Sequence, residues 1–385
     1  MSEWKKVKLK NCCHSISDGD HLPPPKSESG VPFITIANID ATNHIDFSDT
    51  MFVPFEYYDN LNNIRKARCN DILYSVVGSF GKPVLIKENI PFAFQRHIAI
   101  LRPNNEVADS RFLYYIMLTR EFYMQADTVA IGAAQRTISL TALRNIEVEL
   151  PPMEIQHRIA TILSRYDSLI ENYQKQIKLL EEAAQRLYKE WFVDLRFPGH
   201  ENTKIINGLP EGWEKKKVGE LIIKTPRTKQ VSANKYQKSG QIPIIDQSRN
   251  YIAGYTDDMD CIVKVTVPYI VFGDHTRILK YISFSFAKGA DGTQLIMSND
   301  LKRMPQSLFY ISLKGIDLSS YSYARHFKYL KEETLLLPTE CVAKKYDVIV
   351  AKHYYDIQKC RNQIRLLTEA RDRLLPKLMS GEIKI

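Results

Sequence analysis

The stretch from Met153 to Phe197 constrains the fold more than any other part of the chain. Its apolar residues recur at alternating intervals of four and three, with one extra four, and its interior has neither proline nor glycine. This spacing predicts a long amphipathic helix with a narrow coiled-coil seam, in which the extra four is a stutter that relaxes the supercoil. The seam comprises Ile155, Ile159, Ile162, Tyr166, Leu169 or Ile170, Tyr173, Ile177, Leu180, Ala184, Leu187 and Trp191. A helix with such a stripe needs a partner.

The same chain supplies a candidate partner, because residues 342–378 repeat the stripe 187 positions later. The best match is IKLLEEAAQRL at 177–187 against IRLLTEARDRL at 364–374. Shorter matches extend upstream, as in VPFI at 31–34 and IPII at 242–245. An internal repeat of this kind predicts two tandem units, each made of a mixed segment followed by a long helix.

We therefore divide the chain into a first mixed segment at 1–152, a central helix at 153–197, a second mixed segment at 198–338 and a C-terminal helix at 339–385. The predicted fold class is α+β. Two α/β domains form a pseudo-twofold tandem repeat, joined by two long antiparallel helices in an intramolecular coiled coil. The alternative is that each helix only caps its own domain, but the stripe is narrow rather than broad.

The charge of the chain is uneven. There are 53 Lys and Arg against 44 Asp and Glu, which gives a formal net charge of +9. By segment the net charges are −1, 0, +6 and +4 in chain order. A basic chain suggests a polyanionic partner, although a merely basic surface explains the charge as well. In the first segment, phosphate contacts would have to depend on local clusters of basic residues.

Other features exclude several classes of protein. No apolar run approaches a membrane span, the N-terminus lacks a signal-peptide core, and the six cysteines show no metal spacing. We therefore expect a cytoplasmic protein with reduced thiols. The sequence has no GxGxxG, Walker or GxSxG motif, and the adjacent Asp274 and His275 have no further ligand cluster, so we interpret that pair as structural. The chain is predicted not to be an enzyme.

The sequence patterns of the two mixed segments predict short strands and few helices. In the first, the pattern predicts a helix at 111–125 and strands at 32–39, 71–77, 84–86, 98–101 and 146–150. In the second, it predicts a short helix from 307 and strands at 242–245, 262–267, 269–272 and 278–285.

Polar loops between these elements are candidates for binding. The glycines of 78–82 allow backbone amides to approach an anion, and the loops at 95–97 and 132–137 carry Gln and Arg, which read base edges. The stretch 321–328 alternates aromatic and basic residues, which suits base stacking and phosphate contact. Tight hairpins and ordinary surface residues would explain the same loops.

The chain resembles the specificity subunits of type I restriction–modification systems over essentially its whole length. The resemblance rests on LPPMEIQ at 150–156, LPEGW at 209–213, FGDHTR at 272–277 and LLPKLMSGEI at 374–383. The chain departs at the entry to the second helix, where LPTE at 337–340 has Thr in place of the second proline. That departure affects only the local start of the helix.

The resemblance implies that each mixed segment is a target recognition domain that reads one half of a bipartite site in double-stranded DNA. It implies that the paired helices set the spacer between the half-sites and dock two modification (methyltransferase) subunits, which restriction subunits join. S-adenosylmethionine, ATP and Mg would bind those partners, and this chain would hold no cofactor or metal.

Loop placement and side-chain type select the residues expected to contact DNA. They are Lys82, Gln95, Arg96, Gln135 and Arg136 in the first domain, and His275, Arg277, Arg325 and Lys328 in the second. A competing class is a non-catalytic coiled-coil adaptor with two interaction domains. A self-contained modification enzyme is disfavoured by the missing motifs.

Overall fold

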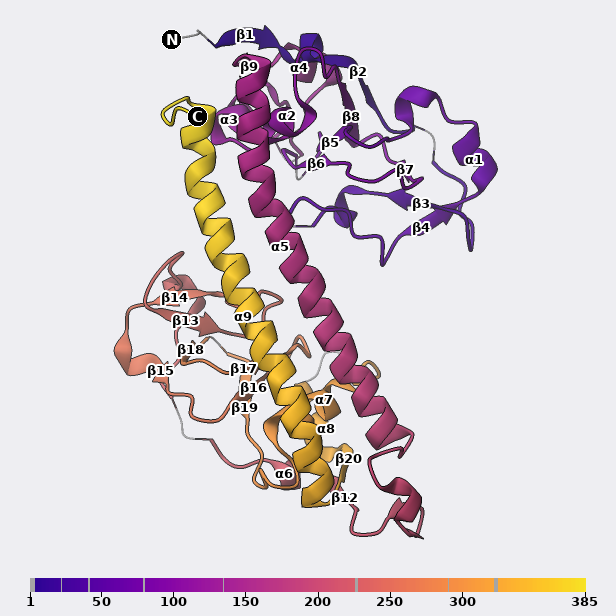
Figure 1. The fold of residues 1–385 in the computed structure, drawn as a ribbon, viewed down its shortest axis with the longest axis vertical. Coiled ribbons are helices and arrows are strands. Elements are labelled where there is room, and N and C mark those ends of the chain that lie inside the picture. The colour runs from indigo at the N-terminus through magenta and orange to yellow at the C-terminus, as the bar shows by residue number, and fades with distance from the viewer. Residues whose placement is uncertain are drawn as a thin grey trace. The chain divides into compact units, whose positions relative to one another are not determined.

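The chain divides into two compact units that share two long helices. The computed structural model describes residues 4–21, 23–40, 42–78, 80–133, 135–225, 228–289, 291–321 and 325–385. The first unit comprises Met1–Ile170 with Leu366–Ile385, and the second comprises Glu171–Arg365. Each unit contains a mixed segment and one part each of α5 (Met153–Tyr188) and α9 (Glu340–Met379) (Figure 1). Both units are α+β.

The first unit is built on three small sheets. The main sheet has the order β2-β8-β5-β6, with strands at Cys13–Asp18, Ile98–Pro103, Ile72–Ser75 and Pro83–Leu85. A second sheet has the order β4-β3-β7, with strands at Met51–Val53, Val31–Ile34 and Ala93–Phe94. In it, β3 and β7 run parallel. The third is an antiparallel pair of β1 (Lys5–Lys8) and β9 (Glu147–Leu150), and β9 leads into α5.

Among the described residues of this unit, four short helices accompany these sheets: α1 Phe55–Asp59, α2 Ser110–Met117, α3 Arg120–Val129 and α4 Leu140–Asn145. The predicted single helix at 111–125 is therefore wrong, because the structure has two helices there. The cause is Thr119, whose hydroxyl donates to the Ile116 carbonyl at 2.7 Å and accepts from the Phe122 amide at 3.2 Å. The Thr119 side chain thus caps the C-terminal end of α2 and the N-terminal end of α3. Such capping favours a break between two helices at that residue.

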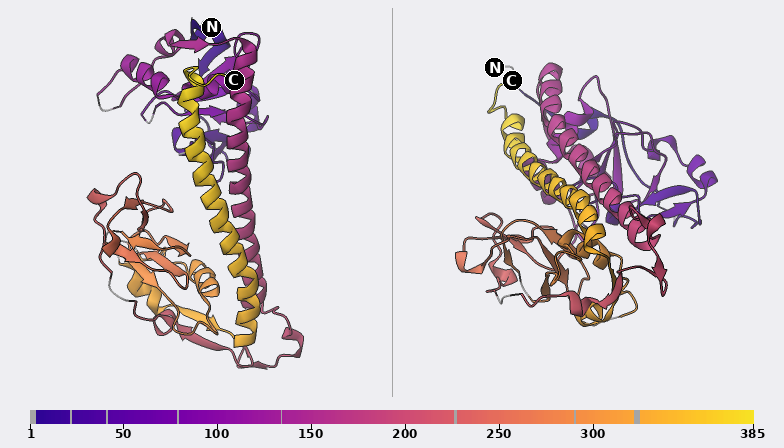
Figure 2. Two further views of the ribbon diagram at one scale, coloured as in Figure 1. Left: turned by 60° about the vertical axis from the view of Figure 1, so that its left-hand side comes forward. Right: turned by 60° about the horizontal axis from the view of Figure 1, so that its bottom comes forward.

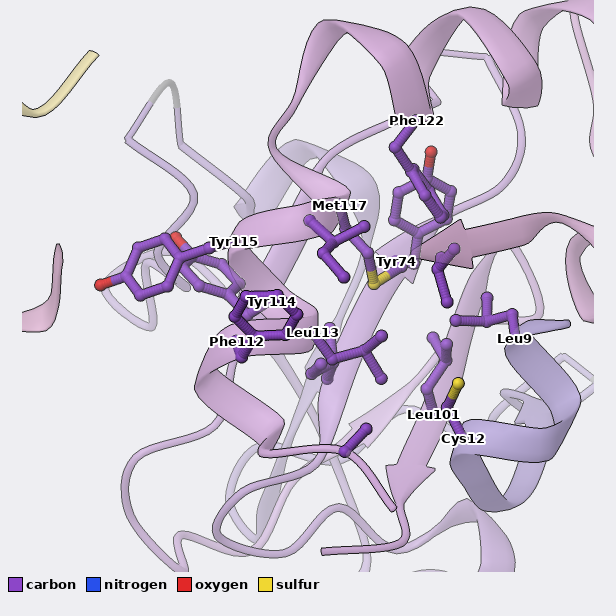
Figure 3. Close-up of a cluster of buried hydrophobic side chains, with 14 of the residues drawn as sticks. Leu9, Cys12, Tyr74, Leu101, Phe112, Leu113, Tyr114, Tyr115, Met117 and Phe122 are labelled. Carbon is purple, nitrogen blue, oxygen red and sulfur yellow. The ribbon is translucent and has the colours of Figure 1, made fainter. Parts of the chain in front are cut away.

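The main core of the first unit lies between the sheet and the helices. Tyr74 of β5 meets Phe122 of α3 edge to face, with ring centroids 5.8 Å apart (Figure 3). Parts of both long helices complete this core, through Ile159, Ala160, Leu163, Leu375 and Leu378. Since burying one such side chain contributes about 1.5–3 kcal/mol, both long helices are integral to the stability of this unit.

Asp167 of α5 joins three helices in the first unit. Its carboxylate accepts from the Tyr115 hydroxyl of α2 at 2.5 Å and from the Arg371 guanidinium of α9 at 2.7 Å. Burial, and then the neighbouring Asp167 carboxylate, raise the pKa of Tyr115 far above its ordinary value. The phenol therefore stays protonated and remains a donor.

Replacing Asp167 with alanine is expected to lower the free energy of unfolding by about 2–4 kcal/mol, because the change leaves the Tyr115 hydroxyl without its acceptor and the Arg371 guanidinium with only its pair to the more exposed Asp372. Chemical denaturation measures the loss. The matched control is Glu182→Ala, which removes an exposed pair with Arg186 on the same helix. That control should change stability by less than about 0.5 kcal/mol. Equal losses in the two variants would contradict the structural role of Asp167.

The second unit repeats this pattern of sheets. One sheet has the order β14-β13-β18-β15, with strands at Gly254–Thr256, Ile242–Ile245, Phe286–Lys288 and Ile262–Val263. Another has the order β17-β16-β19, with strands at Leu279–Ile282, Tyr269–Gly273 and Thr293–Ile296. Two antiparallel pairs join β12 (Glu214–Lys217) to β20 (Thr334–Leu337) and β10 (Ile205–Ile206) to β11 (Leu209–Pro210). The short helices are α6 Val218–Leu221, α7 Gln306–Lys314 and α8 His326–Glu332.

Within the second unit the parts of α5 and α9 lie side by side (Figure 2). The Tyr346 hydroxyl donates to the Ala184 carbonyl at 3.2 Å, and Arg361 pairs with Glu181 at 3.3 Å. Positions later in α5 thus meet positions earlier in α9, so the two segments run antiparallel here. Aromatic packing of Trp191 against Tyr346 closes the end of this helix pair.

The two units have matching internal connections. In each, a strand leads into a long helix, and these two strands, β9 and β20, start 187 residues apart. The parallel pair of β3 with β7 corresponds to that of β13 with β18. Likewise, β5 lies between β6 and β8 as β16 lies between β17 and β19. Equivalent strands therefore occupy equivalent places in the two units.

Several predicted boundaries need correction. The central helix does not reach Phe197, because a π-helical turn at Lys189–Val193 follows α5 and Leu195 adopts a φ of +57°. Predicted strands at 32–39, 262–267 and 278–285 are shorter in the structure, since turns interrupt them. Of the two alternatives for the seam, Ile170 is buried and Leu169 is exposed. No helix in the described residues is long and apolar enough to span a membrane.

Candidate nucleic-acid interface

Three predicted loops of the first unit meet beyond the C-terminal end of β5. We call them the first loop cluster, which comprises the described residues of 76–82, 95–97 and 131–138; Ser79 and Ala134 lie outside the described residues. The Val76 amide donates to the His97 carbonyl at 2.9 Å, and the Gly78 amide donates to the Arg136 carbonyl at 3.0 Å. Backbone hydrogen bonds therefore hold together segments that are far apart in the sequence.

Steric constraints explain why a glycine occupies position 81 in this cluster. Gly81 has a φ of +90°, and a Cβ at this position would lie 2.8 Å from the Tyr123 ring of α3. The ring of Phe80 stacks on Tyr123 with centroids 5.4 Å apart. Since only glycine fits both the backbone conformation and the space, the loop packs closely on α3. The structure thus gives Gly81 a packing role, and the access of an anion to the loop amides stays a prediction.

Two of the predicted residues in this cluster are engaged within the fold. The Lys82 ammonium donates to the Ile39 carbonyl at 3.3 Å. The Arg136 guanidinium pairs with the Asp127 carboxylate at 2.8 Å and also donates to the Asp127 carbonyl. Both side chains keep further donors, but their positions are set by the fold, so they are suited to hold the loops in place.

The other predicted residues are more accessible. Arg96 and Gln135 are exposed, and Gln95 is half-buried, with its backbone amide donating to the Ile34 carbonyl at 3.1 Å. Within the described part of the chain, the Arg96 guanidinium has no hydrogen bond or ion pair. An exposed guanidinium at a loop tip can reach a phosphate or a guanine edge.

In the second unit, the loops around Asp274 form an equivalent arrangement. We call them the second loop cluster, which comprises the described residues of 246–250, 273–278, 289–293 and 318–328; Ala290, Ser322, Tyr323 and Ala324 lie outside the described residues. The buried Asp274 accepts from the Phe327 amide through its carboxylate at 2.8 Å, and its amide donates to the Gly292 carbonyl at 2.7 Å. Asp274 therefore joins three of these loops, in line with a structural role.

The four residues predicted in this unit all lie in the second loop cluster. His275, Arg277, Arg325 and Lys328 are exposed. Arg277 has a φ of +62° and donates from one terminal nitrogen to the Leu318 carbonyl at 3.1 Å. Its remaining donors are accessible, so its guanidinium is oriented while most of its binding capacity is retained.

Sequence reasoning missed two residues of this cluster and a third that lies beneath it. Gln247 donates to the Asp291 carbonyl at 2.9 Å and accepts from the His275 amide at 3.1 Å. Arg249 is exposed in the same loop, and Lys280 is buried beneath it. Gln247 and Arg249 lie in a polar loop after a predicted strand, so the same criteria of loop placement and side-chain type would have found them. Lys280 sits inside a predicted strand, where the pattern had no signal for a polar role.

These clusters lie at the same end of equivalent strands, β5 and β16. Each combines exposed basic and amide side chains with a stacked aromatic pair, Phe80–Tyr123 in one and Tyr321–Tyr329 in the other. Such surfaces can contact phosphates and base edges. Among the described residues, no group of three or more His, Cys, Asp or Glu could hold a metal ion.

Comparison with known proteins points to one family. A sequence model described as the type I restriction modification DNA specificity domain matches residues 1–182. The type I restriction enzyme MjaIX specificity subunit of Methanocaldococcus jannaschii is 25% identical over 306 residues, which is 72% of this chain and 69% of the relative. The MjaVIII specificity subunit of the same organism is 32% identical over 156 residues, 40% of this chain and 35% of that one.

A solved structure is similar over nearly the whole chain. The type I restriction–modification S subunit from M. genitalium superimposes with a TM-score of 0.62 at 17% identity, covering 97% of this chain and 96% of that one. At this identity the likeness shows a shared fold.

Proposed function

The chain belongs to the family of type I restriction–modification specificity subunits, and we propose that its two loop clusters read the two halves of a bipartite DNA site. One observation carries this proposal: the clusters lie at equivalent ends of equivalent strands, yet are built from different residues. Two similar frames with different side chains suit a site whose halves differ in sequence. The target recognition domains are residues 1–152 and 198–338.

Within each cluster, different side chains are suited to different contacts with DNA. Arg96 and Gln135 in the first domain, and Arg277 and Arg325 in the second, are exposed and can reach base edges or phosphates. Lys82 and Arg136 hold the first surface in shape and add phosphate contacts. Gln95 in the first domain, and His275 and Lys328 in the second, add polar contacts to the DNA backbone. Binding should weaken steeply with salt, because the phosphate contacts release counterions.

The long helices supply the remaining parts of the function. We propose that residues 153–197 and 339–385 form an intramolecular antiparallel coiled coil, which relates the two domains by a pseudo-twofold axis. The helix contacts within each unit, such as Asp167 with Arg371 and Ala184 with Tyr346, support this arrangement. In this proposal the rod sets the spacer and docks two modification subunits. Restriction subunits join them, and S-adenosylmethionine, ATP and Mg bind those partners while this chain carries no catalytic residue.

A gel shift with the methyltransferase encoded beside this chain tests the proposal. The complex is expected to shift a duplex carrying the site found by long-read methylome sequencing, and to shift it at least tenfold less well when either half is scrambled. A duplex with both halves scrambled is the control for non-specific binding. Equal binding to all four duplexes would refute sequence reading by this chain.

The same assay addresses the alternative of a coiled-coil adaptor. An adaptor would bind the methyltransferase without changing the DNA preference of that subunit. Methyl transfer by the isolated chain, in turn, would support a self-contained enzyme and contradict the assignment of chemistry to the partners.

A further inference from the structure

Lys280 occupies an unusual position in the second unit. It lies in β17, and its side chain is only 4% exposed. Its partner across the sheet is Val271, whose side chain belongs to an apolar cluster with Ile282 and Phe286. A lysine almost never occupies such a place unless its ammonium is paired.

The equivalent position in the first unit is apolar. There Leu73 of β5 pairs with Val84 of β6, just as Val271 of β16 pairs with Lys280 of β17. Val84 is buried in an apolar cluster and has no polar function. The fold therefore does not need a lysine at this place, and the second unit uses one for a reason of its own.

The Lys280 ammonium reaches the loop 246–250. It donates to the Asn250 carbonyl at 2.5 Å and lies 3.7 Å from the Asp246 carboxylate. The other Asp246 oxygen lies 3.4 Å from the Tyr236 hydroxyl, and Asp246 also accepts from the Ser248 amide at 2.9 Å. Lys280 therefore fastens both ends of the loop to the strand beneath it.

The 246–250 loop in turn holds the turn that carries the predicted DNA-contacting residues. Gln247 accepts from the His275 amide and donates to the Asp291 carbonyl, and the Thr276 hydroxyl donates to the Gln247 carbonyl at 2.6 Å. A Cβ on Gly292 would lie 2.6 Å from the Gln247 amide nitrogen, so this glycine leaves the space that Gln247 fills. Moving the loop would displace the turn that carries His275 and Arg277.

We propose that Lys280 is a positioning residue for the second loop cluster, and that its tether to Asp246 and Asn250 determines how strictly the second half-site is read. This inference rests on the proposed function. Lys280 itself does not contact DNA. Its buried charge holds the 246–250 loop, and that loop orients Gln247 and the 273–278 turn.

The test compares Lys280→Met with Lys264→Met in the full chain bound to its methyltransferase. Methionine keeps the length of the lysine stem but removes the charge, and Lys264 is an exposed lysine of the same unit. Hydrogen exchange should show at least tenfold lower protection of residues 246–250 and of the His275 amide in Lys280→Met only. Discrimination against base changes in the second half-site should fall about tenfold, with the first half-site unaffected.

The pH profile gives a readout that simple packing would not produce. Burial, only partly offset by the Asp246 charge, lowers the pKa of Lys280 from 10.5 to about 8. Loop protection in the unmodified chain should therefore fall as the pH rises through about 8, and this step should be absent from Lys280→Met. Because the unfolded chain holds this proton up to higher pH, the same group makes global stability rise between about pH 8 and 10.5, so global unfolding cannot mimic the step.

Different outcomes test the Lys280 tether and the proposed DNA-reading function separately. Unchanged loop protection in Lys280→Met would overturn the tether, and reduced protection with unchanged half-site discrimination would overturn its link to DNA reading. If the unmodified complex does not discriminate at either half-site, the proposed function itself fails. Should Lys280→Met not fold, Asp246→Asn removes the charge partner of Lys280 from the loop side and must also lower discrimination at the second half-site.

Discussion

Replacing Arg277 with alanine is expected to weaken reading of the second half-site by about 1–3 kcal/mol, roughly five- to 150-fold, and to leave the first half-site unchanged. Arg277 is exposed in the turn after β16, and its single bond to the Leu318 carbonyl orients the guanidinium. Alanine keeps the backbone bond from the residue 277 amide to the Gly273 carbonyl at 2.8 Å, so the turn should persist. Methylation rates on duplexes with single-base changes in each half measure the effect.

Two further variants sharpen this result. Lys314→Ala removes an exposed charge at the C-terminal end of α7, outside the second loop cluster, and should change both half-sites by less than twofold. Arg277→Lys keeps the charge but loses the planar fork, so it should retain binding and lose base discrimination. Equal losses at both half-sites in Arg277→Ala would show that this arginine supports the fold rather than base reading.

Inserting four residues near Gln174 is expected to change the spacer between the half-sites. α5 runs without interruption from Met153 to Tyr188, and four added residues lengthen a helix by about 6 Å, or roughly two base pairs of DNA. The seam also rotates by about 40°, since each residue turns the helix by about 100°. A matched insertion near Cys360, whose thiol lies 3.6 Å from the Gln176 side chain, restores pairing with α9. Methylome sequencing reads the new spacer directly.

The control places the same four residues after Asn202, in the exposed segment between Gly199 and Ile205. This insertion adds chain without lengthening α5, so it should leave the spacer unchanged. A spacer that stays constant when both helices are lengthened would contradict the proposal that they act as a ruler. A spacer that changes in the control would assign the ruler to the linker instead.

Prediction from sequence worked best where the physics is local and periodic. A seam repeated 187 residues later is readable because side chains three and four apart share one helix face, whatever else the chain does. Strands such as β13 were readable for a similar reason, since β-branched residues between turn residues favour extended chain. The break at Thr119 was missed because a capping hydroxyl resembles any other polar residue in a helical pattern.

The sequence alone thus determined the two long helices, the internal repeat and the loops that carry polar residues. Only the tertiary structure decided which loops come together, because the contacts that join Gly78 to Arg136, or the Asp274 carboxylate to the Phe327 amide, are hydrogen bonds between distant segments. It also decided that Arg136 is held by Asp127 whereas Arg96 is exposed. The role of Lys280 depends on its burial and on its contacts with Asp246 and Asn250, which lie far from it in the sequence. Such non-local pairing is not visible in local composition or periodicity.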